Sequence, residues 1–252
     1  MTGMSKPMRR TKIIAAVLVM LLPGLAFTAG GDEYKMVPAM NDVSNIASLQ
    51  RGAKYFVNYC LGCHSAEYVR YNRLAEDLSI NEDQLVSNLM FAAEKPHETM
   101  QIAMPPDDAQ RWFGQTPPDL SLIARSKGTD YLYGFLRSFY LDDSKPTGVN
   151  NLVLANASMP HVLWELQGWQ QRIEATDEEG HKAVRLEQVS AGSLSPDEYD
   201  QVVRDLVNFL DYIGEPMQLE RQQLGIWVLL FLLVFGILSY LLKNEIWKDI
   251  KK

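Results

Sequence analysis

The two cysteines of the chain lie three positions apart and are followed at once by a histidine, in the run Cys60-Leu61-Gly62-Cys63-His64. Two thiols at this spacing on a helical turn can each form a thioether with a vinyl group of a haem. The imidazole of the next residue then lies beneath the iron. The pattern therefore predicts one covalently bound haem c, held by Cys60 and Cys63, with His64 as an axial ligand of the iron.

Two other uses of a cysteine pair fit the sequence less well. A thioredoxin-like redox pair needs a βαβ context, which the flanking residues do not supply. A zinc site needs a second compact pair of ligands, but the remaining histidines, His97, His161 and His181, are scattered. No cysteine is left for a disulfide, so the domain must be held by its core and its haem.

Electron-transfer haem iron takes a second axial ligand, and a thioether there favours the ferrous state. The candidates after the motif are five methionines and the same three histidines: Met90, Met100, Met104, Met159 and Met217, with His97, His161 and His181. Met104 and Met159 stand out because proline follows each, and proline restricts the preceding residue to an extended conformation that suits a ligand on a loop. On these residues alone, both remain candidates.

The elements that must position these groups begin with a helix before the motif. Ile46, Leu49, Ala53, Phe56 and Cys60 recur at steps of three and four, which is the pattern of an amphipathic helix. Its apolar face leads directly to the haem.

Further elements are expected after the motif. Ser79 and Glu82 form a capping box that opens a helix through Leu85 and Leu89. The five prolines between about 95 and 120 predict irregular chain along the haem edge. The remaining expected elements are a helix from Gly128 to Phe139, short strands over 167–173 and 183–189, and a helix from Ser195 to Gly214 capped by Ser195 and Glu198.

The two ends of the chain carry long apolar runs with different flanks. Ile13 to Phe27 follows four basic residues and no acid, which is the layout of a secretory signal. We therefore expect residues 1–29 to be a signal peptide. An uncleaved membrane anchor is the alternative for this segment.

The second run, Leu224 to Leu242, has 19 residues without a charge. As a helix it would span roughly 28 Å, close to the thickness of the bilayer hydrocarbon. We expect a transmembrane anchor over 223–243. Because lysines predominate in the tail, 244–252, the positive-inside rule places the C-terminus in the cytoplasm and residues 30–222 in an external, periplasmic haem domain.

The external domain is strongly acidic. Residues 30–222 contain 29 acidic and 16 basic residues, a balance of about 13 negative charges. This surplus excludes nucleic acid and anionic lipid surfaces as natural partners and favours a basic protein.

Four segments in this order, with one C-terminal anchor, resemble the cytochrome c1 family. They are Arg51-Gly52 leading into the motif, Pro117-Pro118-Asp119-Leu120-Ser121 with Arg125, the run from Met159 to Leu166, and the anchor end from Tyr240 to Asp249. The resemblance covers most of the chain from about residue 40.

The resemblance implies a mainly α, class I cytochrome c-like haem domain with loop insertions, plus one C-terminal transmembrane helix. It implies residence in a bacterial inner membrane with cytochrome b and a Rieske iron-sulfur protein. The subunit would not be catalytic alone. It would carry electrons from the Rieske protein to a soluble or membrane-bound cytochrome c, within a ubiquinol–cytochrome c oxidoreductase.

Site roles follow from the same resemblance. Met159 is the distal ligand, Pro118 lines the haem and Arg125 meets a haem propionate. An arginine also suits a carboxylate on chemical grounds, because its guanidinium can bind one in bidentate fashion. The rival readings are another anchored monohaem cytochrome, such as an oxidase subunit, and a haem enzyme such as a peroxidase, which needs an open distal position.

Overall fold

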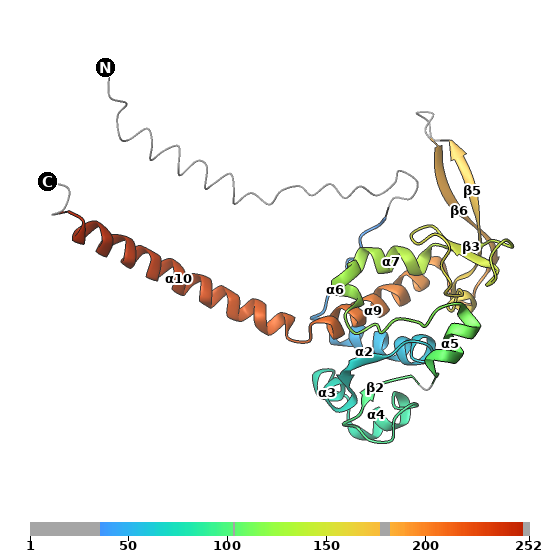
Figure 1. Ribbon diagram of the computed structural model, residues 1–252, viewed down its shortest axis with the longest axis horizontal. Coiled ribbons are helices and arrows are strands. Elements are labelled where there is room, and N and C mark those ends of the chain that lie inside the picture. The colour runs from blue at the N-terminus through green and yellow to red at the C-terminus, as the bar shows by residue number, and fades with distance from the viewer. Residues whose placement is uncertain (1–35, 103, 177–181, 249–252) are drawn as a thin grey trace, which may run out of the picture. The chain divides into compact units, whose positions relative to one another are not determined.

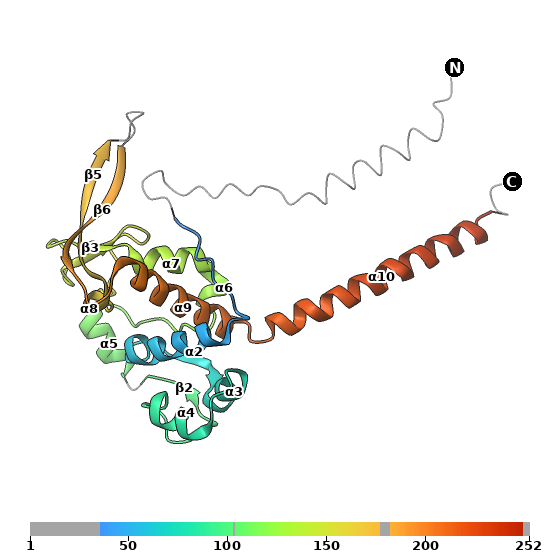
Figure 2. The same ribbon diagram turned by 180° about the vertical axis from the view of Figure 1, so that it is seen from behind.

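The computed structural model describes residues 36–102, 104–176 and 182–248, shown in Figure 1 and from behind in Figure 2. The predicted signal peptide, the end of the predicted tail and His181 lie outside these residues. The helices are α2 (Ile46–Tyr55), the π-helical turn η1 (Phe56–Cys60), α3 (Tyr71–Asp77), α4 (Glu82–Asn88), α5 (Pro106–Phe113), α6 (Ile123–Lys127), α7 (Thr129–Arg137), α8 (Trp164–Gln167), α9 (Pro196–Gly214) and α10 (Gln218–Ile246). The strands are β1 (Ala66–Arg70), β2 (Thr99–Met100), β3 (Phe139–Leu141), β4 (Val149–Asn151), β5 (Gly168–Thr176) and β6 (Lys182–Ala191).

The predicted helix before the motif is present as α2 continued by η1. Leu49, Ala53, Phe56 and Cys60 are buried as the periodicity predicts, whereas Ile46, in the first turn, is exposed. Asn45 caps the helix, its side chain accepting a hydrogen bond from the Ser48 backbone N–H.

Helices α2 and α9 pack closely against each other, as both views show (Figures 1 and 2). Gly52 allows this contact: a Cβ there would lie 2.1 Å from the Asp205 carbonyl oxygen and 2.6 Å from Phe209 Cβ. The rings of Phe56 and Phe209 meet beside it, with centroids 5.4 Å apart. A glycine thus lets two helices far apart in sequence form the centre of the core.

A buried carboxylate strengthens the same crossing. Asp205 on α9 accepts hydrogen bonds from Ser48 Oγ at 2.7 Å and Arg51 Nε at 2.6 Å, both on α2. Arg51 Nη2 and Gln201 Nε2 each add another at 2.9 Å. Because its oxygens are fully occupied, this charge is compensated although the Asp205 side chain is only 2% exposed.

Helix α9 begins and ends where the sequence predicts. Ser195 and Glu198 form the expected capping box, Pro196 is the first helical residue and Gly214 is the last. The helix predicted after Gly128 is also confirmed as α7, which ends at Arg137, two residues before Phe139.

The capping box predicted at Ser79 and Glu82 is wrong. The N-cap of α4 is Asn81, whose side chain accepts from the Gln84 N–H at 2.8 Å, while Gln84 Oε1 receives the Asn81 N–H. Ser79 has a φ of 54° and lies in the turn that ends α3. The start of α4 is therefore two residues later than predicted.

The prediction of irregular chain throughout 95–120 is wrong for α5. Pro106 occupies the first helical turn, where its missing N–H costs nothing, and Asp107 and Asp108 follow in the acidic first turn that a helix dipole favours. Gly114 ends the helix with a φ of 75°. The proline opens this helix.

Three two-stranded antiparallel pairs complete the fold: β1 with β2, β3 with β4, and β5 with β6. The strands predicted over 167–173 and 183–189 are confirmed as β5 and β6, which are longer than expected. The pairs β1–β2 and β3–β4 are additions that the sequence patterns did not predict.

The predicted anchor lies in α10, a 29-residue helix that starts earlier and ends later than the uncharged run. It is the one helix in the described part of the chain with the length and apolar composition to cross a membrane, and none of its apolar window is buried against other residues. The architecture is thus mainly α, with a domain of helices, short strand pairs and loops before one apolar C-terminal helix.

Candidate haem site

The wide turn η1 delivers Cys60 to the wall of a cavity. Its widened geometry is marked by the bond from Leu61 N–H to the Phe56 carbonyl, 2.9 Å, and π-helical turns of this kind often occur at functional sites. The chain then tightens, because the N–H groups of Cys63 and His64 both donate to the Cys60 carbonyl. These bonds bring both thiols and the imidazole to one side of the cavity.

His64 is held by a residue 54 positions away. Its Nδ1 lies 2.7 Å from the Pro118 carbonyl oxygen, which can only accept, so Nδ1 carries the proton and Nε2 keeps a free lone pair. Burial lowers the pKa of His64, and the Pro118 bond and the Asp119 charge oppose this shift. The neutral ring therefore lines the cavity with a free lone pair on Nε2 that can bind a metal.

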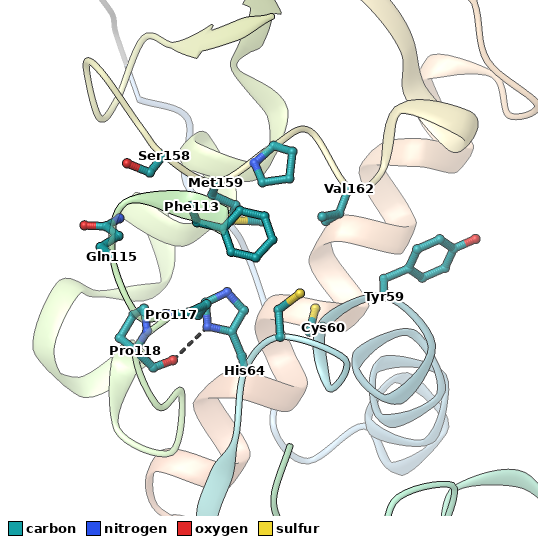
Figure 3. Close-up of a pocket in the computed structure, with 12 residues that line it drawn as sticks. Tyr59, Cys60, His64, Phe113, Gln115, Pro117, Pro118, Ser158, Met159 and Val162 are labelled. Carbon is teal, nitrogen blue, oxygen red and sulfur yellow. Dashed lines mark hydrogen bonds between the residues drawn. The ribbon is translucent and has the colours of Figure 1, made fainter. Parts of the chain in front are cut away.

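Figure 3 shows the cavity with His64 on one side and Met159 across from it. The first lobe is lined largely by apolar side chains, among them Tyr59, Phe113, Pro117, Pro118 and Val162. The second lobe shares Cys60, His64, Pro118 and Met159 and continues between α6, α7 and α9. The imidazole of His64 and the thioether of Met159 therefore line both lobes.

Of the methionines considered, Met159 is the one that lines both lobes. Met90 and Met100 are buried, and Met100 in β2 pairs with Ala66 in β1. Met104 is half-buried just before α5 and does not line either lobe among the described residues. Met217 Sδ instead receives a hydrogen bond from Arg73 at 3.6 Å.

The other histidines that the structure describes lie away from the cavity. His97 is exposed. His161 is buried in an aromatic cluster, its ring stacked on Phe139 at 5.0 Å and edge-on to Trp169 at 5.9 Å. Burial lowers the pKa of His161 to about 4, so this imidazole is neutral.

Arg125 lies on α6, outside the cavity lining within the described part of the chain. Its Nη1 is 2.9 Å from Glu215 Oε2, and its Cγ packs against Gly214. Glu215 also pairs with Arg221. The contact of Arg125 with a haem propionate stays a prediction.

The two thiols are unpaired and sit in apolar surroundings. Burial, with a smaller contribution from the Cys63 charge, raises the pKa of Cys60 to about 12, and burial also raises the pKa of Cys63. Both groups are therefore neutral S–H groups at the cavity wall.

These groups fit a haem c. Two free thiols at the required spacing, an imidazole with one nitrogen already bonded, and a thioether across an apolar cavity form the donor set that this cofactor uses. Fold and site together define a class I cytochrome c-like haem protein.

Known proteins place the chain more narrowly. The sequence model of the Cytochrome C1 family matches residues 38–250. Cytochrome c1 of Allochromatium vinosum is 51% identical over 244 residues, which cover 95% of this chain and 99% of that protein. The chain belongs to the cytochrome c1 family, which bears haem c, and α10 is its membrane anchor.

Two further relatives show the range of the similarity. A protein of Nitrosomonas europaea named ammonia monooxygenase gamma subunit is 44% identical over 243 residues, 96% of this chain and 100% of that protein. The mitochondrial cytochrome c1 heme protein of Saccharomyces cerevisiae is 26% identical over 234 residues, 81% of this chain and 68% of that protein.

The structure brings together Cys60, Cys63, His64, Pro118 and Met159 and leaves Arg125 outside the lining. Sequence reasoning missed the role of the Pro118 carbonyl and several wall residues: Tyr59, Phe113, Gln115, Lys127 and Tyr131. The aromatic positions had a detectable signal, because Tyr131 and Phe135 repeat with helical spacing.

Proposed function

We propose that the chain is the haem-bearing, electron-transfer subunit of a bacterial bc1 complex. In this role it takes electrons from a Rieske iron-sulfur protein beside cytochrome b and passes them to a cytochrome c. It is not catalytic alone. The family match and the likeness to cytochrome c1 of Allochromatium vinosum along nearly the whole chain support this role.

The observation that carries the proposal is the pairing of His64 and Met159 across one cavity. A bound haem supplies one-electron oxidation and reduction of its iron. Cys60 and Cys63 would hold a single haem covalently, and His64 and Met159 would supply an imidazole nitrogen and a thioether sulfur to its iron. A haem iron that took both side chains as ligands would have no free position for a substrate, which supports electron transfer over a peroxidase.

The surrounding residues have matching roles in the proposal. The Pro118 carbonyl fixes the proton on His64 Nδ1 and so keeps Nε2 toward the metal. The apolar wall excludes water, which keeps reorganisation on electron transfer small. Arg125, which pairs with Glu215, would reach a haem propionate only from outside the cavity lining of the described residues.

The proposed location is a bacterial inner membrane. Residues 1–29 direct export and are removed, residues 30–222 form the periplasmic haem domain, 223–243 span the membrane and 244–252 lie in the cytoplasm. The apolar helix α10 and the bacterial relatives support anchoring.

A second candidate function is a haem subunit attached to a monooxygenase, and the name of the Nitrosomonas europaea relative is the observation that favours it. An oxidase subunit is a third. These roles share the haem site and differ in the chains that accompany it.

Purification of the native chain in mild detergent separates these candidates. We expect a haem that survives acid-acetone extraction, a redox-active spectrum and co-purifying cytochrome b and Rieske protein. Co-purification with monooxygenase or oxidase subunits alone would favour a rival role. Loss of haem on extraction would overturn covalent attachment.

A further inference from the structure

A positively charged side chain lies at the rim of the proposed haem cavity. The second lobe is bounded mainly by apolar side chains, and the one cationic residue that lines it in the described part of the chain is Lys127, at the end of α6. Lys127 Nζ is 5.7 Å from the ring centroid of Tyr131, which also lines the lobe. Lys127 is exposed while Tyr131 is half-buried, so the pair marks where cavity meets solvent.

A haem carries two carboxylates, and an apolar cavity can hold its ring only if these groups reach a polar rim. Gln115 and Ser158 offer neutral hydrogen-bond partners there, and Lys127 offers the positive charge. Arg125, by contrast, lies outside the lining and already pairs with Glu215 at 2.9 Å.

We propose that Lys127 is a haem-binding residue whose ammonium group pairs with a haem carboxylate at the rim of this cavity. The proposal rests on the proposed function, because it takes the cavity to hold haem. It adds a cation to that site that neither the attachment motif nor the cytochrome c1 resemblance indicated.

The other charged and titratable groups near Lys127 already have hydrogen-bond or ion-pair partners, or are partly buried. Asp130 on α7 accepts the Ala39 N–H at 2.8 Å, and Asp119 accepts the Ser121 N–H at 2.8 Å. Glu215 is shared by Arg125 and Arg221, His64 is bonded to Pro118, and burial raises the pKa of Tyr131. Lys127 is thus the charge with which a carboxylate in this lobe would interact most directly.

The test is the haem midpoint potential of the full-length, haem-loaded chain in detergent, measured between about pH 5 and pH 8. A positive charge beside haem disfavours the ferric state. Lys127→Met should therefore lower the midpoint potential at the high-pH end of this range. We expect at least a threefold change in relative ferrous stability, or about 28 mV. Without the ammonium, the carboxylate takes up a proton at higher pH, so the pH-dependent region should move toward neutrality.

Two variants make the result specific. Lys127→Arg keeps the charge and should restore most of the wild-type profile. Lys95→Met removes an exposed lysine outside the cavity lining and should leave the profile unchanged. If the profile of Lys127→Met coincides with that of Lys95→Met while covalent haem is present, the pairing is wrong and the haem assignment stands. If wild-type samples contain no haem, the proposed function itself fails.

Discussion

The bond between His64 and Pro118 decides which imidazole nitrogen is free. A backbone carbonyl cannot be changed by side-chain substitution, so the orientation of His64 depends on the path of the loop before α6. Asp119 holds that path, since its carboxylate accepts the N–H groups of Glu67 and Ser121 at 2.8 Å. The orientation of His64 is therefore fixed by backbone groups, whereas the proposed second ligand is the side chain of Met159.

Substitution of Met159 is therefore the most direct test of the proposed distal ligand. Met159→Leu should leave the distal position vacant or filled by water. Loss of the thioether removes its stabilisation of ferrous haem, so the midpoint potential should fall by more than 59 mV, which is the shift for a tenfold change in relative affinity. Redox titration measures this fall, and the spectrum should lose its long-wavelength sulfur-to-ferric-iron band and show new binding of carbon monoxide.

Met104→Leu is the matched control, because Met104 also precedes proline but lies outside the cavity lining within the described residues. It should leave potential, spectrum and carbon monoxide binding nearly unchanged. If the two variants exchange these behaviours, the distal ligand assigned by the family resemblance is wrong.

At the scale of elements, the close crossing of α2 and α9 depends on Gly52. Gly52→Ala places a methyl group 2.1 Å from the Asp205 carbonyl oxygen, so the helices must separate or bend. Overpacking of this kind costs about 1–3 kcal/mol, and the free energy of unfolding should fall by that amount. Thermal unfolding followed by circular dichroism checks it.

Lys54→Ala on the same helix is the control, because Lys54 is exposed. It should keep the wild-type unfolding midpoint. An unchanged midpoint for Gly52→Ala would mean that the two helices tolerate a wider spacing than the structure describes.

The elements that sequence predicts well are those whose ends and apolar stripes are both local. Helix α9 has a capping box at Ser195 and a buried stripe, and it was predicted nearly to the residue. The prolines around helix α5 suggest irregular chain, but Pro106 stands at the first helical position, where proline is favoured. Ser79 and Asn81 both have side chains that can cap the start of α4. Ser79 lies in the turn that ends α3, so Asn81 is the N-cap.

The site shows the same division. Cys60, Cys63 and His64 follow from their spacing alone. The Pro118 carbonyl and the rim position of Lys127 do not, because they depend on loops that approach from 54 and more residues away. Local sequence patterns do not predict which distant segments of the chain come into contact.

At the scale of the whole molecule, the anchor fixes which side of the membrane each part occupies. A phosphatase that folds only outside the cytoplasm should be active when fused after Glu215, before α10, and inactive when fused after Lys252. Enzyme activity of the two fusions in intact cells measures this. The reverse pattern would overturn the orientation inferred from the lysines of the tail.

The acidic surface predicts how the molecule meets its acceptor. About 13 surplus negative charges in residues 30–222 should speed encounters with a basic cytochrome c at low salt. The second-order rate of electron transfer, measured by stopped flow, should fall as ionic strength rises, because screening shortens the Debye length to about 8 Å at 0.15 M. A rate independent of salt would limit the acidic surface to a role in solubility.

The proposed electron transfer from a Rieske protein is tested most directly by the haem absorbance of the chain, purified with its partner subunits, when a ubiquinol is added. We expect this haem to be reduced within a single turnover when the Rieske protein is present. Reduction should be lost when the Rieske protein is removed and return when it is added back. A haem that stays oxidised in the intact complex, or is reduced equally well without the Rieske protein, would contradict the proposed electron transfer.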